Sequence, residues 1–190
     1  YPDECDHAPP RDVVRQAEDT HVARLWGAAP AAGATLIEAR FPRAYIDANR
    51  SLADVDPELL GDAWPDPVAP SRKTALGIGL VWRLARGGVP MYARKLTSAE
   101  VQRRIDRCWR PYHAELDAAL DARHRAFGGV WHLNCHSMPA VGDALSDDPG
   151  RERADFVLGD RDGTTCDPAF TRTVADCARN FGYSVAINDP

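Results

Sequence analysis

The sequence lacks any apolar run that approaches the roughly 20 residues needed to cross a bilayer. It also lacks a basic patch with interleaved aromatics, and its formal net charge is −5, so neither a membrane nor a nucleic acid is an expected partner. The first residues, Tyr-Pro-Asp-Glu-Cys-Asp, are acidic and contain no apolar stretch, which predicts that they are not a signal peptide. These absences favour a soluble protein whose partner is neither a membrane nor a nucleic acid.

Cysteine pairs at metal-binding or disulfide spacing are missing as well. The five cysteines are odd in number, widely spaced and without a Cys-x-x-Cys pair: Cys5, Cys108, Cys135, Cys166 and Cys177. This pattern predicts thiols in a reducing, cytoplasmic compartment and argues against a cysteine-based zinc site. No Gly-x-Ser-x-Gly elbow surrounds Ser137, so a serine triad is not expected either.

What is present is ordinary globular composition, with 44% hydrophobic and 27% charged residues. A chain of 190 residues with no internal repeat predicts one domain with a real core. The stretch 54–71 is rich in Pro, Asp and Gly and predicts a long loop, of the kind that is often functional.

Apolar periodicity predicts helices that alternate with short strands. The helices are expected over 11–26, over 99–127 and from Pro168 to Gly182, and the strands over 35–40, 130–135, 156–158 and 184–188. Thr97 and Glu100 form a capping-box pattern, and Pro111 is expected to kink the long helix that follows. This alternation predicts an α/β layer fold.

His136 comes directly after the predicted strand 130–135. Ligands of open α/β sheets collect at the carboxyl ends of strands, and a neutral imidazole there is well placed to bind a metal. The alternative is a histidine that caps loop carbonyls. The residues alone leave both open.

Two further groups of polar residues have a functional and a plain interpretation. Asn49 and Arg50 are suited to bind an anionic substrate, because a guanidinium forks onto a carboxylate; the alternative is a turn with an exposed arginine. Glu18 and Asp19 would point about 100° apart on a helix, so only one of them is expected to face a cleft, and a solvated acid is the alternative. His113, between Trp109 and Leu116, is expected to be a hydrogen-bonded core histidine; the alternative is a histidine that supports the metal ligands from behind.

Several motifs occur in a characteristic order, and together they resemble the N-formylglutamate amidohydrolase family over nearly the whole chain. They are Glu18-Asp19-Thr20-His21-Val22, the run from Pro42 to Arg50, Pro111-Tyr112-His113, the run from Asn134 to Pro139, Leu158-Gly159-Asp160 with Gly163-Thr164-Thr165-Cys166, and Asn188-Asp189-Pro190.

The resemblance implies a three-layer, zinc exopeptidase-like α/β fold, with a central mixed, mostly parallel sheet flanked by helices. It implies one zinc ion and hydrolysis of a small N-acyl amino acid, for example N-formyl-L-glutamate to formate and glutamate, in histidine degradation. His136 then matches a catalytic zinc ligand and Asp19 a second metal ligand. Asn49 and Arg50 match the pair that binds the substrate α-carboxylate.

Family members also carry a Pro-His-Ser-Gly motif just before the position of Tyr1, which supplies another zinc ligand. They continue beyond Pro190 into a Lys-Gly-Gly segment, where the catalytic carboxylate is expected. The resemblance therefore implies that residues 1–190 are a single catalytic domain without these two parts. A hydrolase of related N-acyl amino acids or peptides, and a non-catalytic binding domain of the same fold, stay open as alternatives.

Overall fold

The computed structural model describes residues 7–142 and 148–189, apart from the side chain of Arg86. Cys5 and Pro190 lie outside these residues. The chain divides into two compact units, Tyr1–His136 and Ser137–Pro190. The fold is mixed α/β, and its sheet is small and parallel. Among the described residues, no helix is both long and apolar enough to cross a membrane.

The first unit is built from several short helices and one long helix, which are joined by loops. Its elements are α1 (Arg11–Arg15), α2 (Val22–Leu25), η1 (Ala29–Ala32), η2 (Pro57–Leu59), α3 (Arg72–Ala75), η3 (Arg86–Gly88), α4 (Ser98–Arg104), the π-helical η4 (Ile105–Trp109) and α5 (Arg110–Phe127). The predicted loop 54–71 is confirmed, with η2 as its one regular turn among the described residues.

The prediction of one helix over 11–26 is wrong, because the chain forms α1 and α2 with a turn between them. His21 adopts a left-handed conformation with φ 70°, which no α-helix can contain. Only Val14 of the expected apolar stripe is buried, whereas Leu25 is 77% exposed. The turn between the helices carries Asp19.

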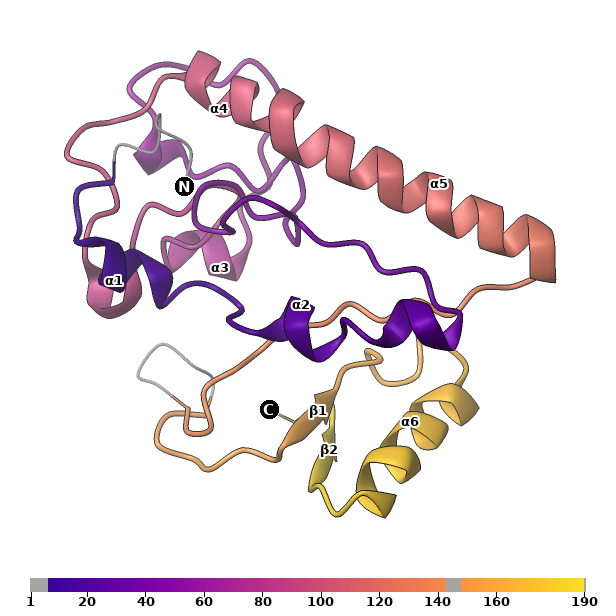
Figure 1. Ribbon diagram of the computed structural model, residues 1–190. Helices are drawn as coiled ribbons and strands as arrows, with labels where there is room; N and C mark the ends of the chain where they lie inside the picture. The colour runs from indigo at the N-terminus through magenta and orange to yellow at the C-terminus, as the bar shows by residue number, and fades with distance from the viewer. Residues whose placement is uncertain (1–6, 143–147, 190) are drawn as a thin grey trace. The chain divides into compact units, whose positions relative to one another are not determined.

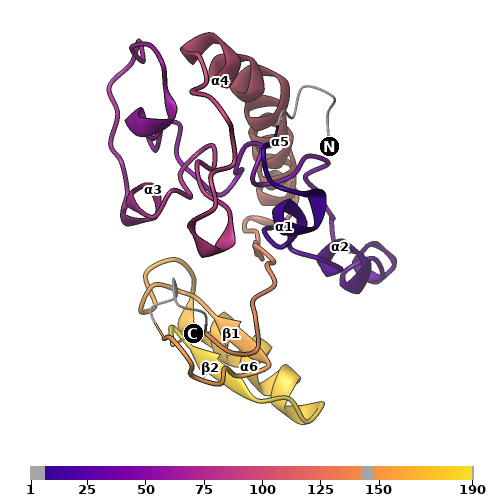
Figure 2. The same cartoon turned by 90° about the vertical axis from the view of Figure 1, so that its left-hand side faces the viewer.

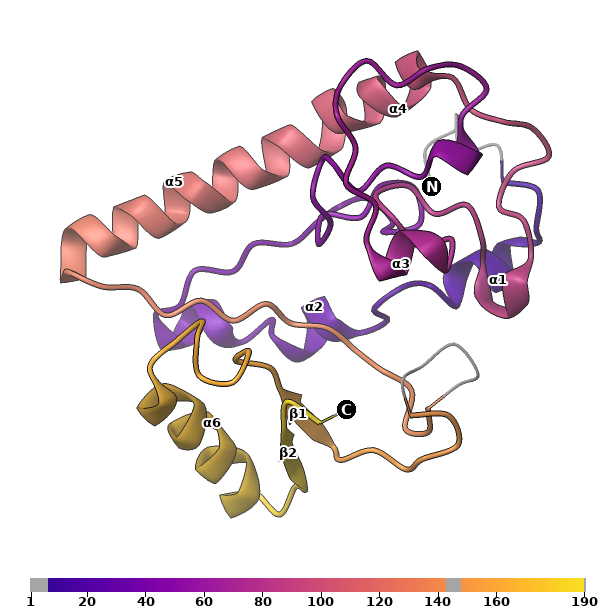
Figure 3. The ribbon, with the colours of Figure 1, turned by 180° about the vertical axis from the view of Figure 1, so that it is seen from behind.

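The long helix is confirmed in position and has an irregular centre. The side chain of Thr97 accepts from the backbone of Glu100, whose carboxylate accepts from the Thr97 backbone, so the capping box is present. Figures 1, 2 and 3 show α4 running into α5 without a break. The disturbance expected at Pro111 takes the form of the π segment η4, which ends two positions before the proline. Gly128, with φ 73°, ends the helix as predicted.

The strands expected over 35–40 and 130–135 are wrong. Both segments lie outside any ladder among the described residues, and their apolar side chains are largely exposed, at 41% for Leu36 and 62% for Trp131. A strand exists only through hydrogen bonds to a neighbouring strand. An apolar pattern predicts an extended conformation and does not provide the neighbour.

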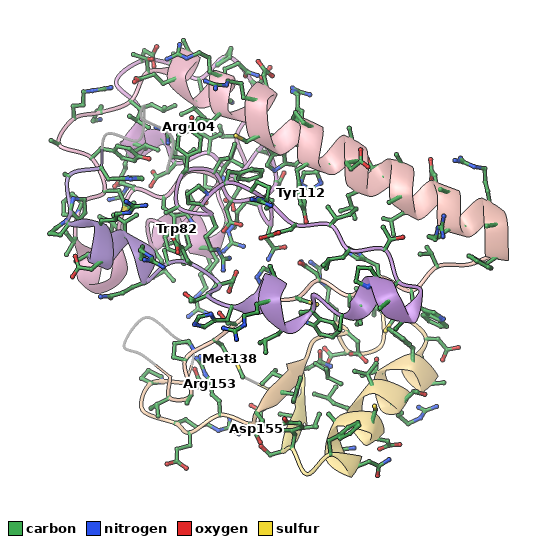
Figure 4. The ribbon with its side chains drawn as sticks, in the orientation of Figure 1. Trp82, Arg104, Tyr112, Met138, Arg153 and Asp155 are labelled. Atoms are coloured by element: carbon green, nitrogen blue, oxygen red, sulfur yellow. The ribbon has the colours of Figure 1, made fainter. Side chains whose placement is uncertain are left out.

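The core of the first unit joins the loops 44–60 and 80–96 to α1, α4 and η4. Its most deeply buried side chains include Ile46, Leu80, Met91 and Ile105. Arg104, labelled in Figure 4, is buried on α4 and donates from Nη1 to the Tyr45 carbonyl and the Tyr92 hydroxyl. These bonds offset the cost of burying its charge.

In its described residues, the second unit contains a two-stranded parallel sheet and one helix, as the sequence predicts. β1 (Phe156–Leu158) pairs with β2 (Val185–Ile187), and α6 (Pro168–Asn180) connects them. The Asp167 side chain accepts from the Ala169 backbone to cap α6. Asp160, just after β1, is buried and accepts from Asn188, Gly163 and Thr171, and these donors lower its pKa.

Candidate active site

His136 and Asp19 meet in the first unit. The Nδ1 atom of His136 lies 2.9 Å from an Oδ of Asp19, and the two side chains are 36% and 23% exposed. Asp19 reaches this position because the turn after α1 takes it off the helical path, so that it is not the solvated acid of the alternative interpretation. The structure thus brings together the two residues that the sequence predicts as metal ligands.

The Asn49 side chain lies on the other side of the imidazole. Its Nδ2 is 3.4 Å from His136 Nε2, and its Oδ1 accepts from Asn134 Nδ2 at 3.2 Å. A His136 tautomer that is protonated at Nδ1 would donate to Asp19 and accept from Asn49. Both ring nitrogens therefore have polar neighbours, which is an arrangement that fixes the ring direction.

Arg43 joins Asp19 to a second carboxylate. Its Nη1 donates to Asp19 at 3.0 Å, while Nε and Nη2 both donate to one Oδ of Asp47, at 3.3 and 3.2 Å. Asp47 is buried, and it also accepts from the Asn49 backbone at 2.9 Å and from Trp82 Nε1. A buried carboxylate requires such donors, and here they hold the turn that starts at Asp47.

The Arg50 guanidinium is held by hydrogen bonds to backbone carbonyls. Arg50 is therefore not the exposed arginine of the alternative interpretation. Its Nε donates to the Ile78 carbonyl at 3.2 Å, Nη1 donates to the Asn49 carbonyl at 3.2 Å, and Asp54 lies 3.9 Å from Nε. Nη2 makes no hydrogen bond to any residue that the structure describes. The guanidinium is therefore held in place with one edge available to an anion.

The long helix supports the same turn from behind. Trp109 Nε1 donates to the Arg50 carbonyl at 3.0 Å, and His113 Nε2 lies 2.9 Å from the Ala48 carbonyl. The rings of Trp109 and His113 stack at 3.8 Å. His113 is hydrogen-bonded as the sequence predicts, but it is half-buried and not a core residue, and it contacts the backbone of the turn at Ala48.

Gly79 permits a close approach beneath this turn. A Cβ at this position would lie 2.8 Å from the Asp54 carbonyl, closer than such atoms can pack. Asp54 is buried and accepts from Ser71 and from the Thr74 hydroxyl, which ties together the two ends of the loop 54–71. The loop is thus attached to the same carboxylate that lies beside Arg50.

Asp19 and His136 are of the residue types that bind zinc, and together they would supply two ligands. Zinc binds carboxylate oxygen and imidazole nitrogen, and two ligand atoms about 2.0–2.2 Å from a tetrahedral ion lie roughly 3.4 Å apart. The observed separation of 2.9 Å is close to that value. Within residues 7–142 and 148–189, no group of three or more His, Cys, Asp or Glu side chains is arranged to hold a metal.

Cys135 adjoins His136 but is no thiolate candidate. Burial raises the pKa of its thiol, so the thiol stays protonated at neutral pH.

Arg43, Asp47, Asn134 and Trp82 contact the candidate site residues or one another, and the sequence assigned a role to none of the four. The first three lie within the ordered motifs, so their position beside the candidate ligands was the available signal. Their roles depend on contacts between distant segments, such as the one from Asn134 to Asn49. No local pattern encodes such contacts.

Comparison with known proteins gives a consistent result. A sequence profile described as N-formylglutamate amidohydrolase matches residues 1–190. The N-formylglutamate deformylases of Pseudomonas putida and Pseudomonas aeruginosa are 30% and 31% identical to the chain over 173 residues. The aligned region is 90% of this chain and 58% of each relative, so the chain spans less than two thirds of their length.

A solved structure is similar throughout. The crystal structure of N-formylglutamate amidohydrolase from Ralstonia eutropha JMP134 has a TM-score of 0.93 and 51% sequence identity to this chain. The match covers 100% of this chain and 68% of that one. With a profile that matches from the first residue to the last, the chain belongs to the N-formylglutamate amidohydrolase family.

Proposed function

We propose that this protein is a zinc-dependent amidohydrolase that cleaves the amide bond of an N-formyl amino acid, with N-formyl-L-glutamate as the leading substrate. Family membership and the names of the relatives support the reaction. The observation that carries the proposal is the meeting of Asp19 and His136 beside the Asn49–Arg50 turn. Metal donors and an anion-binding group then lie within one site.

In this proposal Asp19 and His136 hold the zinc ion. When bound, zinc supplies a Lewis acid that polarises the formyl carbonyl and activates water. Catalytic zinc sites commonly have three protein ligands, so we propose a third ligand, and also the general base, outside residues 1–190. In the overall reaction water adds its oxygen to the formyl carbon, the C–N bond breaks, the amine nitrogen takes a proton, and formate and the amino acid leave.

Arg50 and Asn49 would orient the substrate. The guanidinium is held by two carbonyls, so its available edge can bind the α-carboxylate with little further loss of side-chain freedom. The Asn49 amide lies between His136 and Asn134, where it can donate to the substrate or keep the imidazole in place. Fixing the substrate beside the reacting group is a main source of catalysis.

We further propose that the described units are part of a three-layer, zinc exopeptidase-like fold and form one catalytic domain. The parallel sheet and the likeness to the Ralstonia eutropha structure support this. The reaction would serve histidine degradation in the cytoplasm. The thiols of Cys108, Cys135, Cys166 and Cys177, which form no disulfide, support a reducing compartment.

The test is zinc content and formate release of the full-length protein in which His136 is replaced by alanine. We expect His136→Ala to lose zinc and to release formate at a small fraction of the wild-type rate. His132→Ala is the matched control, because His132 is exposed on the same segment and lies outside the site. Formate release unaffected by His136→Ala would refute the assignment. A protein that binds the substrate but never releases formate would instead be a binding domain.

A substrate panel tests the choice of amino acid. N-formyl-glutamate is compared with N-formyl-alanine and with N-acetyl-glutamate. We expect the highest kcat/KM for N-formyl-glutamate. Equal values for the two formyl compounds would indicate a hydrolase of N-formyl amino acids in general, and an equal value for N-acetyl-glutamate would indicate a broader N-acyl amino acid hydrolase.

A further inference from the structure

Arg43 connects the proposed metal ligands to the proposed substrate-binding turn. It contacts Asp19 with one nitrogen and Asp47 with two, and Asp47 in turn accepts from the Asn49 backbone. The Asp19 oxygen that accepts from Arg43 is the same Oδ2 atom that faces His136 Nδ1. The Arg43 guanidinium thereby holds both Asp19, one of the two proposed metal ligands, and Asp47, the first residue of the proposed substrate-binding turn.

We propose that Arg43 is a positioning residue that sets zinc affinity and substrate affinity together. It touches neither the reacting atoms nor the substrate carboxylate in this scheme; it acts through Asp19 on one side and through Asp47 on the other. The inference rests on the proposed function, because it assumes that Asp19 and His136 hold zinc.

The planar fork is the feature that makes arginine suited to this role. A guanidinium has five N–H donors in fixed directions, and Arg43 directs three of its nitrogens to two different carboxylates. A lysine ammonium is a compact charge that cannot reach both in the same way. Residues that orient metal ligands typically change metal affinity by about 10–100-fold when they are altered.

The burial of Asp47 explains why Asp47 needs the Arg43 guanidinium beside it. The Asp47 side chain is 3% exposed, so its charge requires Arg43, and Arg43 is additionally stacked 5.5 Å from the Trp82 ring. Removing the positive charge entirely would leave a buried carboxylate without its cation, which costs stability. Lysine keeps the charge and removes the fork, so Arg43→Lys is the informative substitution.

The chain offers a matched control in Arg83. The Arg83 side chain is 25% exposed, and the Arg43 side chain is 23% exposed. Like Arg43, Arg83 bridges two carboxylates: the buried Asp56 at 2.6 Å and Glu58 at 3.0 Å. Although Arg83 follows Trp82 in the chain, its side chain makes no hydrogen bond or ion pair to a site residue within the part of the chain that the structure describes. Arg83→Lys therefore imposes a similar structural change away from the site.

The experiment measures zinc affinity by chelator competition, together with KM, kcat and thermal stability, in the full-length protein. We expect Arg43→Lys to weaken zinc binding by about 10–100-fold and to raise KM, while Arg83→Lys leaves both unchanged at a similar loss of stability. Free guanidinium is expected to restore zinc binding to Arg43→Ala and to have no effect on the zinc binding of Arg83→Ala. Wild-type zinc affinity in Arg43→Lys, or an equal loss in Arg83→Lys, overturns the inference.

Asp47→Asn provides a second route if Arg43→Lys does not fold. It weakens the hold of Arg43 on the turn, because it removes the charge and the oxygen that accepts from Arg43 and Trp82, while the remaining amide oxygen can still accept from the Asn49 backbone. The same combined loss of zinc and substrate affinity is expected, and unchanged zinc affinity contradicts the inference. If His136→Ala loses zinc while Arg43→Lys keeps it, only this inference fails; if His136→Ala keeps zinc, the proposed function itself fails.

Discussion

His136 Nδ1 lies 2.9 Å from an Oδ of Asp19, although 117 positions separate the two residues along the chain. The pair forms because the turn after α1 and the extended segment that ends at His136 meet in the same unit. Such a contact between distant segments is costly in chain entropy, and its members are polar and part-exposed. A part-exposed pair of this kind is expected to add little stability.

Asp19 is expected to be needed for metal binding and not for folding. We predict that Asp19→Asn lowers zinc affinity at least tenfold, because it removes the negative charge of the ligand pair, and that the far-UV circular dichroism spectrum is unchanged. Zinc affinity is measured by chelator competition. Glu18→Gln is the control, since Glu18 is the neighbouring acid and pairs with Arg15. Equal zinc affinity in Asp19→Asn and wild type would remove Asp19 from the ligand set.

Arg50 is expected to act in substrate binding. A carboxylate that is bound equally in the ground and transition states contributes to KM and leaves kcat unchanged. We predict that Arg50→Lys raises KM on the order of tenfold, which corresponds to the loss of about one charged hydrogen bond. Steady-state formate release measures both constants. Arg40→Lys, at a side chain that is 85% exposed, serves as the control. A fall in kcat at constant KM would contradict this role.

Glu100 makes stability depend on pH. Hydrogen bonds from Arg94 and Thr97 lower its pKa to about 2. The pKa of Glu100 is depressed in the folded state, so its ionised carboxylate stabilises the fold. This stabilisation is complete above the unfolded glutamate pKa of about 4.3 and is lost as pH falls toward about 2. We predict that the difference in unfolding free energy between wild type and Glu100→Gln shrinks across this window, as measured by urea unfolding at pH 6 and pH 3. Glu115→Gln, on the exposed face of α5, is expected to show no such change with pH.

Ile105 tests the core of the first unit. It is 2% exposed at the start of η4. Truncation of a buried isoleucine leaves a cavity, so Ile105→Ala is predicted to cost about 2–5 kcal/mol and Ile105→Val about 0.5–1.5 kcal/mol. Leu25→Ala, at a residue that is 77% exposed, is predicted to stay within about 0.5 kcal/mol of wild type. The free energies come from urea unfolding, and an equal cost at the two positions would place Ile105 outside the core.

Local signals in the sequence predicted those parts of the fold that depend on neighbouring residues. The Thr97–Glu100 capping box, the Asp167 cap with Pro168 and the glycine end at Gly128 are all confirmed. Each involves atoms within a few positions of one another, so residue type alone carries the information. β1 and β2 were also predicted, from their apolar patterns and the helix between them, although their pairing joins residues as distant as Phe156 and Val185.

Features that depend on distant partners could not be predicted in the same way. The segments 35–40 and 130–135 have the composition of strands and lack ladder partners among the described residues. The helix expected over 11–26 is interrupted at His21, a residue type with no strong helix-breaking signal. Within the site, His136, Asp19, Asn49 and Arg50 were identified through ordered motifs, while the bridge formed by Arg43 became visible only from its contacts.

The π-helical segment η4 has a consequence for the length of the chain. A π turn holds one residue more than an α turn, and each residue advances a helix by about 100° and 1.5 Å. Deleting one residue between Ile105 and Trp109 would let this turn close as an ordinary α turn, so α4 and α5 would keep their relative rotation. The same deletion in a regular turn of α4 would instead rotate the residues after it by about 100° against those before it. Trp109 and His113, which contact the carbonyls of Arg50 and Ala48, depend on that rotation. The π turn is thus a place where the helix can lose one residue and still present these two side chains to the same backbone.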